Sequence, residues 1–273
     1  MQTELIQRQY NEIIAPHYDL DPQGLIGRSL TKALEQIQSL RDEIGTDEIL
    51  KVLDVGCGTG KFCERLKNES GFVTQLHGLD LSEKMADIAL ERLPEMRIEV
   101  DCASNLNANF EGEQFGLICT HFMTSFVPLD ILAPQIRDKV KPGGLWSFVG
   151  GTMAGYPALR KKADAKLLKI VFGGKSLPID NLVTNPKDRE AVTSAMQSQG
   201  FEVLRCESYK PTVHFRNFND FMEFGYRGGW LTPFIEHLGL HNAKRTTRAL
   251  LNALVFPIRD YHDIEIVIGR KVR

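Results

Sequence analysis

The sequence predicts an α/β protein with a doubly wound, mostly parallel sheet and helices on both of its faces. The first observation is the segment 49–55, where β-branched and aliphatic residues accumulate as in a buried strand. Glycines interrupt this run, and Phe62 and Leu66 then follow at helical spacing. The second observation is that further short apolar runs alternate with amphipathic segments, the arrangement from which parallel sheets are built.

The turn after the first strand is rich in glycine. It contains Gly56, Gly58 and Gly60, and Asp54 lies just before them. Glycine allows positive φ and lets a ligand approach the main chain, and the amides at the helix start face a polar group. A dinucleotide fingerprint needs its third glycine at the position of Lys61, and Asp54 would repel a pyrophosphate. The turn therefore favours a ligand with a cationic amine.

Two more acidic residues close the next two apolar runs. Asp80 ends the run 76–80, about twenty residues beyond the turn, where an acid can accept hydrogen bonds from both hydroxyls of a ribose. Asp101 closes the run 97–101 in the same way. A turn at 141–145 then leads into another strand.

The pattern of Asp54, Gly56, Gly58 and Gly60 closely resembles the first motif of class I S-adenosylmethionine-dependent methyltransferases. The resemblance covers residues 48–150 well, and the stretches from 187 to 210 and from 257 to 270 less fully. It implies a Rossmann-like sheet of seven strands with an antiparallel last strand, S-adenosylmethionine as cofactor, and no metal. The alternative is another Rossmann-like nucleotide binder.

In that family the first acid lies near the methionine amino group, the second binds the ribose and the third meets the adenine amino group. The resemblance implies these cofactor-binding positions: Asp54, Gly56, Cys57, Gly58, Gly60, Asp80, Leu81, Met85, Asp101, Cys102, Ala103, Thr120 and Tyr18. Four of them keep an alternative. Met85 and Tyr18 could simply be core or packing residues, and either Cys102 or Ala103 could present its amide to the base.

The acceptor is expected beyond the strand 115–120, because ligands of doubly wound sheets lie at the carboxyl ends of strands. His121 lies there and is the candidate general base for a hydroxyl or acidic-carbon acceptor; a core histidine is the alternative. The other candidate acceptor-binding residues are His17, Phe122, His214, Tyr226 and Trp230. The motifs Asn/Asp-Pro-Pro-Tyr and Pro-Cys of nucleobase methyltransferases are absent, which disfavours a nucleic-acid base as acceptor.

With 273 residues, the chain is expected to form a single methyltransferase domain with additions. The predicted order is N-terminal helices and a lid over 1–47, the cofactor-binding core over 48–150, cap insertions over 151–186 and 211–256, and the end of the core over 187–210 and 257–273. The second insertion is rich in aromatic residues. Phe218, Phe221 and Phe224 predict a helix face packed on a core, or else a roof over the acceptor.

Two helices are predicted in detail. An apolar stripe predicts one helix over 29–44, ended by Gly45. A second helix is predicted over 128–140, with an inner face made of Ile131, Leu132, Ile136 and Val140.

The composition of the chain excludes or disfavours several classes of function. The net charge of −2 and a pI of about 6.4 provide no general attraction for nucleic acid. Five cysteines without a Cys-x-x-Cys pair indicate reduced thiols in the cytoplasm, no histidine or cysteine spacing indicates zinc, and no apolar segment reaches membrane-spanning length. The prediction is a cytoplasmic enzyme that methylates a small molecule on oxygen or carbon. The alternatives are an RNA or protein methyltransferase, with basic contacts at 160–169 and 244–248, and a non-catalytic cofactor-binding module.

Overall fold

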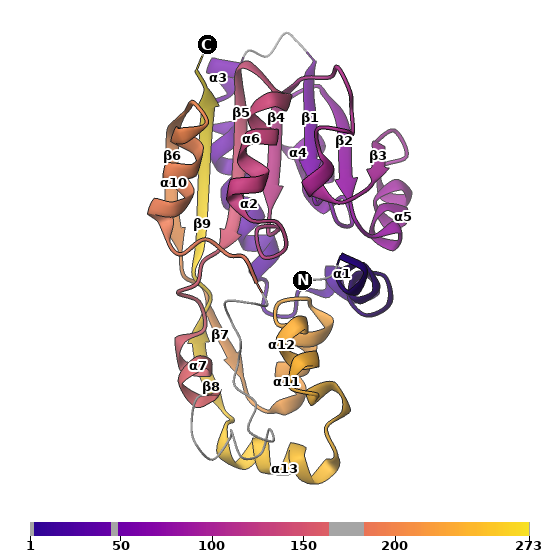
Figure 1. The fold of residues 1–273 in the computed structure, drawn as a ribbon, viewed down its shortest axis with the longest axis vertical. Helices are drawn as coiled ribbons and strands as arrows, with labels where there is room; N and C mark the ends of the chain where they lie inside the picture. The colour runs from indigo at the N-terminus through magenta and orange to yellow at the C-terminus, as the bar shows by residue number, and fades with distance from the viewer. Residues whose placement is uncertain (1–2, 45–48, 164–182, 273) are drawn as a thin grey trace. The chain divides into compact units, whose positions relative to one another are not determined.

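The computed structural model describes residues 3–44, 49–163 and 183–272, which form two compact units (Figure 1). The larger unit comprises residues 26–153, 184–209 and 264–273, and the smaller unit comprises residues 1–25, 154–183 and 210–263, as far as they are described. The predicted basic segment 160–169 continues past Ala163 outside the described residues.

The larger unit is built on a sheet of seven strands in the order β3-β2-β1-β4-β5-β9-β6. The five strands from β3 to β5 are parallel, and β9 is antiparallel to both β5 and β6. This confirms the predicted doubly wound sheet and its antiparallel last strand. The strand order reverses between β1 and β4, which places a ligand crevice at their carboxyl ends. The strands are β1 (Leu50–Val55), β2 (Thr74–Asp80), β3 (Arg97–Val100), β4 (Phe115–His121), β5 (Val140–Gly151), β6 (Phe201–Tyr209) and β9 (Ile264–Lys271).

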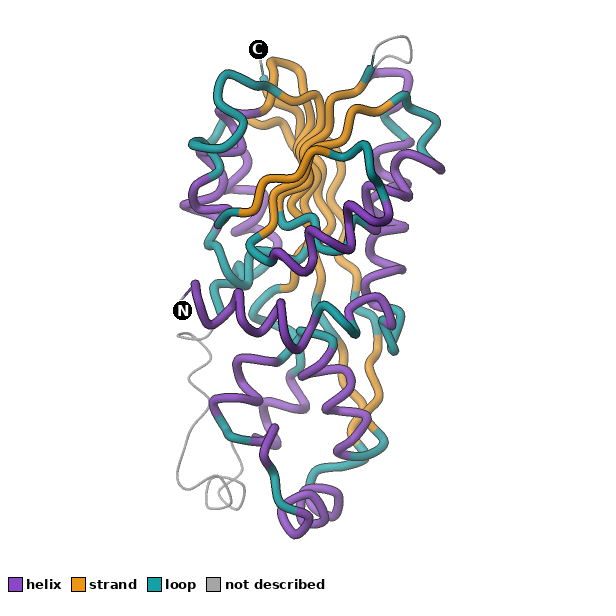
Figure 2. Tube along the Cα trace, turned by 90° about the vertical axis from the view of Figure 1, so that its right-hand side faces the viewer, coloured by secondary structure: helices purple, strands orange, loops and turns teal. Residues whose placement is uncertain are grey.

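Helices cover both faces of this sheet (Figure 2). The helix after β2 shows why they begin where they do: Ser82 Oγ accepts a hydrogen bond from the amide of Met85 at 3.1 Å, which is an N-cap. The helices are α2 (Leu25–Gln38), α3 (Arg41–Ile44), α4 (Lys61–Glu69), α5 (Glu83–Arg92), η3 (Ala103–Asn105), α6 (Leu129–Lys139) and α10 (Arg189–Ser198).

Two helix predictions are wrong in detail. The helix expected over 29–44 is divided into α2 and α3, because Ser39 Oγ donates to the carbonyl of Gln36 at 2.7 Å and competes with the helical hydrogen bonds. On α6, Ile131 was expected on the inner face but is 47% exposed. The buried face is turned away from it, so that Ala133 packs in the core with Leu132 and Ile136.

The smaller unit has its own apolar core and a two-stranded antiparallel sheet that the sequence did not predict. Phe218, Phe221 and Phe224 are all buried in that core, as expected for a helix face packed on apolar residues. Its elements are α1 (Thr3–Gln9), η1 (Tyr10–Ile14), η2 (Tyr18–Leu20), α7 (Pro157–Ala163), β7 (Thr212–Phe215), α11 (Phe218–Met222), η4 (Glu223–Arg227), α12 (Thr232–His237), η5 (Leu240–Asn242), α13 (Arg245–Leu254) and β8 (Ile258–Tyr261).

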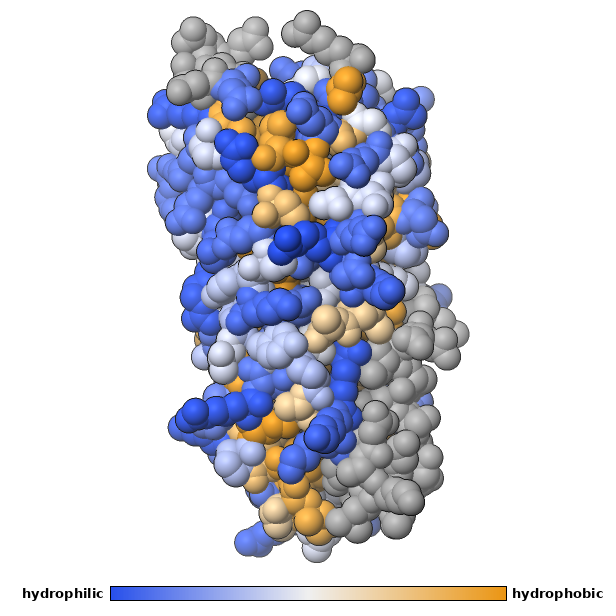
Figure 3. All heavy atoms as spheres, turned by 90° about the vertical axis from the view of Figure 1, so that its left-hand side faces the viewer, coloured by the Kyte–Doolittle hydropathy of each residue, from blue (hydrophilic) through white to orange (hydrophobic). Residues whose placement is uncertain are grey.

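Within the described ranges, no helix combines the length and the apolar character needed to cross a membrane. On the face drawn in Figure 3, most surface atoms are hydrophilic and the hydrophobic ones gather in a few patches.

Candidate cofactor-binding site

The glycine-rich turn joins β1 to α4 and adopts backbone angles that favour glycine. Gly56, Gly58 and Gly60 have φ of +77°, +53° and +72°. A Cβ at Gly60 would lie 3.1 Å from the Cβ of Ala89 on α5, closer than side chains normally pack. The amide of Gly56 donates to the carbonyl of Leu79 at 2.7 Å, so the turn is also tied to the end of β2.

Cys57 points beneath this turn. Its side chain is buried, and a Cβ at Gly78 on β2 would lie 2.8 Å from Cys57 Sγ. Gly78 therefore makes room for the thiol, and Cys57 can offer a ligand its main chain but not its side chain.

Asp54, near the end of β1, is a buried acid with an unused hydrogen-bond acceptor. Its side chain is 2% exposed, and Oδ2 accepts a hydrogen bond from Cys63 Sγ at 3.6 Å. Among the described residues, none donates to Oδ1. Burial raises the pKa of the Asp54 carboxyl to about 7. Since a buried acceptor without a partner is costly, the site fits a ligand that brings a positively charged donor.

Asp80 ends β2 and holds the turn in place. Oδ2 accepts from the amide of Gly58 at 2.8 Å, and Oδ1 accepts from the amide of Ser82 at 2.9 Å. These bonds, with a further one from the amide of Leu81, fix the plane of the carboxylate. A carboxylate held at the end of a strand in this way is the kind of group that accepts hydrogen bonds from the hydroxyls of a ribose.

Asp101 follows β3 and is held by its own loop. Oδ1 accepts from the amide of Cys102 at 2.6 Å and from Asn105 Nδ2 at 3.1 Å, while Oδ2 accepts from Asn109 Nδ2 at 2.9 Å. The hydrogen bond from Asn109 is the main cause that lowers the pKa of Asp101 below its ordinary value, so the acid is ionised. Sequence reasoning missed both asparagines; their amides in the polar loop after β3 were the available signal.

Asp54 lies on β1, Asp80 ends β2 and Asp101 follows β3. These three parallel strands are neighbours in the sheet (Figure 1), so the acids come together at the edge formed by the carboxyl ends of the strands. Asp54 pairs in register with Gly78, two residues before Asp80, and the amide of Asp101 donates to the carbonyl of Asp80 at 3.0 Å. The order of the three carboxylates along this edge is the one expected for a ligand with an aliphatic amine at one end, a sugar diol in the middle and the amino group of a nucleobase at the other end.

The other predicted cofactor residues have mixed surroundings. Met85 is completely buried on α5, whereas Leu81 and Cys102 are partly exposed, and Ala103 is buried at the start of η3. Thr120 is also buried, and its Oγ1 accepts from Trp146 Nε1 at 2.8 Å, which commits that hydroxyl to the sheet core. Tyr18 lies on η2 of the smaller unit.

His121, the candidate base, is 8% exposed at the end of β4. Its Nε2 lies 3.1 Å from Ser147 Oγ, and its ring meets that of Phe62 edge-on at 4.3 Å. Nδ1 has no hydrogen-bond partner among the described residues. Burial lowers the pKa of His121 to about 3, so the imidazole is neutral near pH 7 and is a weak base in this state.

Phe122 follows directly and has φ of +59°, an uncommon conformation for a bulky side chain, while its amide donates to the carbonyl of Val149 at 2.6 Å. Such strain often marks functional positions.

The remaining acceptor candidates belong to different elements of the smaller unit. Trp230 stacks on Phe224 with the ring planes 4° apart, and the Tyr226 hydroxyl donates to Glu236 Oε1 at 3.2 Å. The main chain of His214 bonds the side chain of Gln23. His17 precedes η2 and is partly exposed. No group of three or more His, Cys, Asp or Glu side chains in the described part of the chain is arranged to hold a metal ion.

Comparison with known proteins agrees with this geometry. The family described as "methyltransferase domain" matches residues 52–144. The demethylmenaquinone methyltransferase of Leptospira interrogans is 29% identical over 179 residues, which cover 59% of this chain and 70% of that protein. The mitochondrial ubiquinone biosynthesis O-methyltransferase of Candida albicans is 35% identical over 51% of this chain and 43% of its own length. The crystal structure of the YcgJ protein of Bacillus subtilis shares the fold, with a TM-score of 0.59 and 15% identity over 89% of this chain and 99% of that one.

The matched family model, these similarities, the sheet order and the glycine turn with its three acids support a methyltransferase. They support class I in particular, the methyltransferases that take the methyl group from S-adenosylmethionine.

Proposed function

We propose that this enzyme transfers the methyl group to an oxygen or carbon atom of a small-molecule acceptor. Two relatives, named for demethylmenaquinone and for ubiquinone biosynthesis, support a small acceptor. The observation that carries the cofactor part of the proposal is Oδ1 of Asp54, a buried carboxylate oxygen without a donor at the end of β1.

The three acids divide the cofactor between them in this proposal. Asp54 binds the amino group of the methionine moiety, Asp80 accepts from the ribose hydroxyls, and Asp101 accepts from the amino group of adenine. The turn from Gly56 to Gly60 brings the main chain close to the ligand. The bound cofactor supplies a methyl group on a sulfonium, whose leaving group is neutral and requires no acid.

His121 is proposed as the base that takes a proton from the acceptor. Its place beside the strained Phe122 at the end of β4 supports this role, although its low pKa requires that the acceptor itself be acidic or that its surroundings change on binding. His17, Phe122, His214, Tyr226 and Trp230 are proposed to contact the acceptor. The five unpaired cysteines support a reducing, cytoplasmic location.

Incubation with cofactor labelled in its methyl group tests the function. A metabolite extract, bulk RNA and denatured protein are offered separately, and the labelled product is identified by mass. Label in a small molecule alone supports the proposal; label only in RNA or protein contradicts it.

Replacement of Asp80 by alanine is expected to weaken binding of S-adenosylhomocysteine by roughly ten- to a hundredfold, because hydrogen bonds to a charged group contribute about 1.5–3 kcal/mol. Calorimetry measures the change. Affinity equal to that of the unchanged protein would refute the ribose role.

Replacement of His121 by asparagine is expected to lower kcat by roughly a hundredfold while leaving cofactor affinity within about threefold, the effect typical of removing a general base. Because the imidazole is already neutral, the wild-type rate should show no inflection near pH 6.5 that belongs to His121. An unaltered kcat would remove His121 from the reaction.

A further inference from the structure

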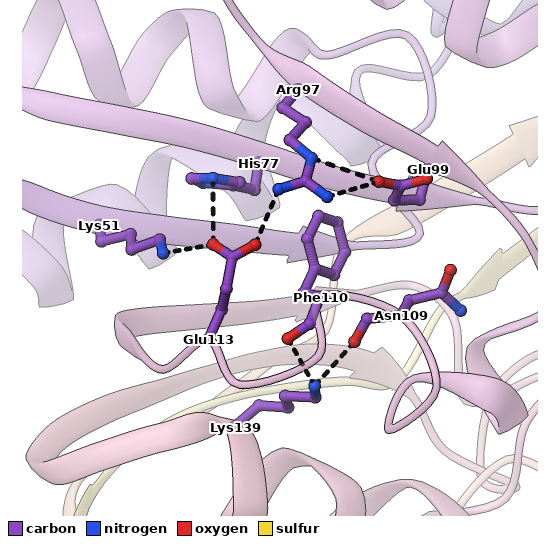
Figure 4. A network of polar contacts seen from close by, with 8 residues as sticks. All are labelled: Lys51, His77, Arg97, Glu99, Asn109, Phe110, Glu113 and Lys139. Atoms are coloured by element: carbon purple, nitrogen blue, oxygen red, sulfur yellow. Dashed lines mark hydrogen bonds and ion pairs between the residues drawn. The ribbon is translucent and has the colours of Figure 1, made fainter.

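The loop that carries Asp101 begins with the amide of Asp101 bonded to the carbonyl of Asp80 and continues to Glu113. Figure 4 shows the contacts of its middle and its far end with other elements of the larger unit. At the far end, Glu113 Oε1 accepts from Arg97 at 2.8 Å and Oε2 accepts from Lys51. The middle of the loop forms hydrogen bonds with α6, and one of the α6 side chains that make them carries a buried charge.

That charge is Lys139, at the end of α6. It is 6% exposed, and its Nζ donates to the carbonyl of Asn109 at 2.7 Å and to the carbonyl of Phe110 at 2.8 Å. Figure 4 shows the ammonium pointing at these two oxygens. Lysine is rarely buried so fully, because an ammonium group that is removed from water loses most of its hydration. Here both of these bonds go to the main chain of a loop that is distant in the sequence.

The same helix makes a further contact with this loop. Gln135 Oε1 accepts from the amide of Asn107 at 3.0 Å. The last two turns of α6 therefore hold the main chain of the loop at three points, Asn107, Asn109 and Phe110.

Phe110 shows that the loop needs such support. Its φ is +52°, a left-handed conformation that is unfavourable for a bulky side chain. Its ring is buried and meets the rings of Phe115 and His77 edge-on at 5.7 and 5.8 Å. A strained residue persists only where its surroundings fix it, and Lys139 together with these rings does so.

The loop conformation in turn decides where Asn109 points. Its Nδ2 donates both to Asp101 Oδ2 at 2.9 Å and to the carbonyl of Asn105 at 3.1 Å. An unbroken series of direct hydrogen bonds thus runs from the ammonium of Lys139, through the main chain and side chain of Asn109, to the carboxylate of Asp101.

We propose that Lys139 is a positioning residue for recognition of the nucleobase: by fixing Asn109, it orients the Asp101 carboxylate toward the exocyclic amino group of adenine. The inference rests on the proposed role of Asp101. It predicts that Lys139, which bonds the main chain of the loop at Asn109 and Phe110, sets how well the enzyme distinguishes adenine from a purine without the amino group.

The test is a ratio of two affinities. Calorimetry gives the Kd of S-adenosylhomocysteine and of its analogue with hydrogen in place of the 6-amino group. The wild-type protein is expected to prefer adenine by roughly ten- to a hundredfold, the effect of one hydrogen bond to a charged group. In Lys139→Met, which keeps the side-chain length but donates no hydrogen bond, this preference is expected to fall by about tenfold.

Lys271→Met is the matched control. Lys271 Nζ also donates to two main-chain carbonyls near the end of α6, those of Arg137 at 2.6 Å and Val140 at 2.8 Å, and none of its recorded bonds reaches the loop. A general loss of stability would affect both variants, but only Lys139→Met should change the ratio. If Lys139→Met does not fold, Asn109→Ala removes the final link alone, and the same fall in the ratio is expected.

The outcomes separate the inference from the function on which it rests. If Lys139→Met and Asn109→Ala both keep the wild-type ratio while Asp101→Ala abolishes it, the positioning role is refuted and the role of Asp101 stands. If the wild-type protein itself shows no preference for adenine, the role of Asp101 fails, and the inference fails with it.

Discussion

Replacement of Asp54 by asparagine is expected to weaken binding of S-adenosylhomocysteine by roughly a hundredfold or more. Asparagine keeps the shape of the side chain but removes the charge, and loss of one partner from a buried ion pair costs about 3–5 kcal/mol. In the proposed site, the ligand's amino group would lose its only assigned carboxylate, because Asp80 and Asp101 are assigned to the ribose and the base. Calorimetric titration at pH 7.5 measures the loss.

Asp87→Asn provides the control, since Asp87 is an exposed acid on α5 that forms an ion pair with Lys84. It should leave the affinity unchanged. A second measurement uses the raised pKa of Asp54. Because an ammonium favours the ionised carboxylate, ligand binding below pH 7 should release a proton, and the binding enthalpy should vary with the buffer. An affinity for Asp54→Asn within threefold of wild type would disprove the ion pair.

The stability of the ligand-free protein is expected to carry a contribution from Asp54 that falls as pH rises. The pKa is about 7 in the folded state against an ordinary value of 3.8, so the folded state holds this proton more tightly than the unfolded state does. The stabilisation is therefore complete below pH 4 and is lost as pH rises to about 7. A shift of about three units corresponds to at most roughly 4 kcal/mol.

Asp54→Asn cannot titrate at this position, so its ligand-free form should be more stable than wild type at pH 8, although it binds the cofactor less well. Urea unfolding of both proteins at pH 5 and pH 8 measures the effect. The difference between the two proteins is the useful quantity, because the lowered pKa of His121 acts in the opposite direction and is common to both. Equal pH dependence of the two proteins would show that Asp54 is not buried as described.

The cofactor end of the site could be predicted because its residues are set by local pattern. Asp54, Asp80 and Asp101 each end or follow a short apolar run, and parallel strands bring such positions to one edge. The sequence did not indicate Asn109 or Lys139. They meet through packing between segments 30 residues apart, and a lysine in a charged helix end looks like a solvated residue until its burial is known.

Long-range pairing was missed for the same reason. Strands β7 and β8 are separated by more than forty residues, so no short turn marks them as partners. The division between α2 and α3 falls at Ser39, whose hydroxyl bonds the carbonyl of Gln36, and the apolar stripe continues across it. Strand pairing over long sequence distances and breaks within a helix are determined by tertiary contacts, and the spacing of apolar residues in the sequence does not reveal those contacts.

The unpaired oxygen of Asp54 has a consequence for turnover. The amino group proposed to meet it is the same before and after methyl transfer, so this contact cannot distinguish fresh donor from spent donor. The spent molecule should therefore keep this contact and compete with fresh donor for the site.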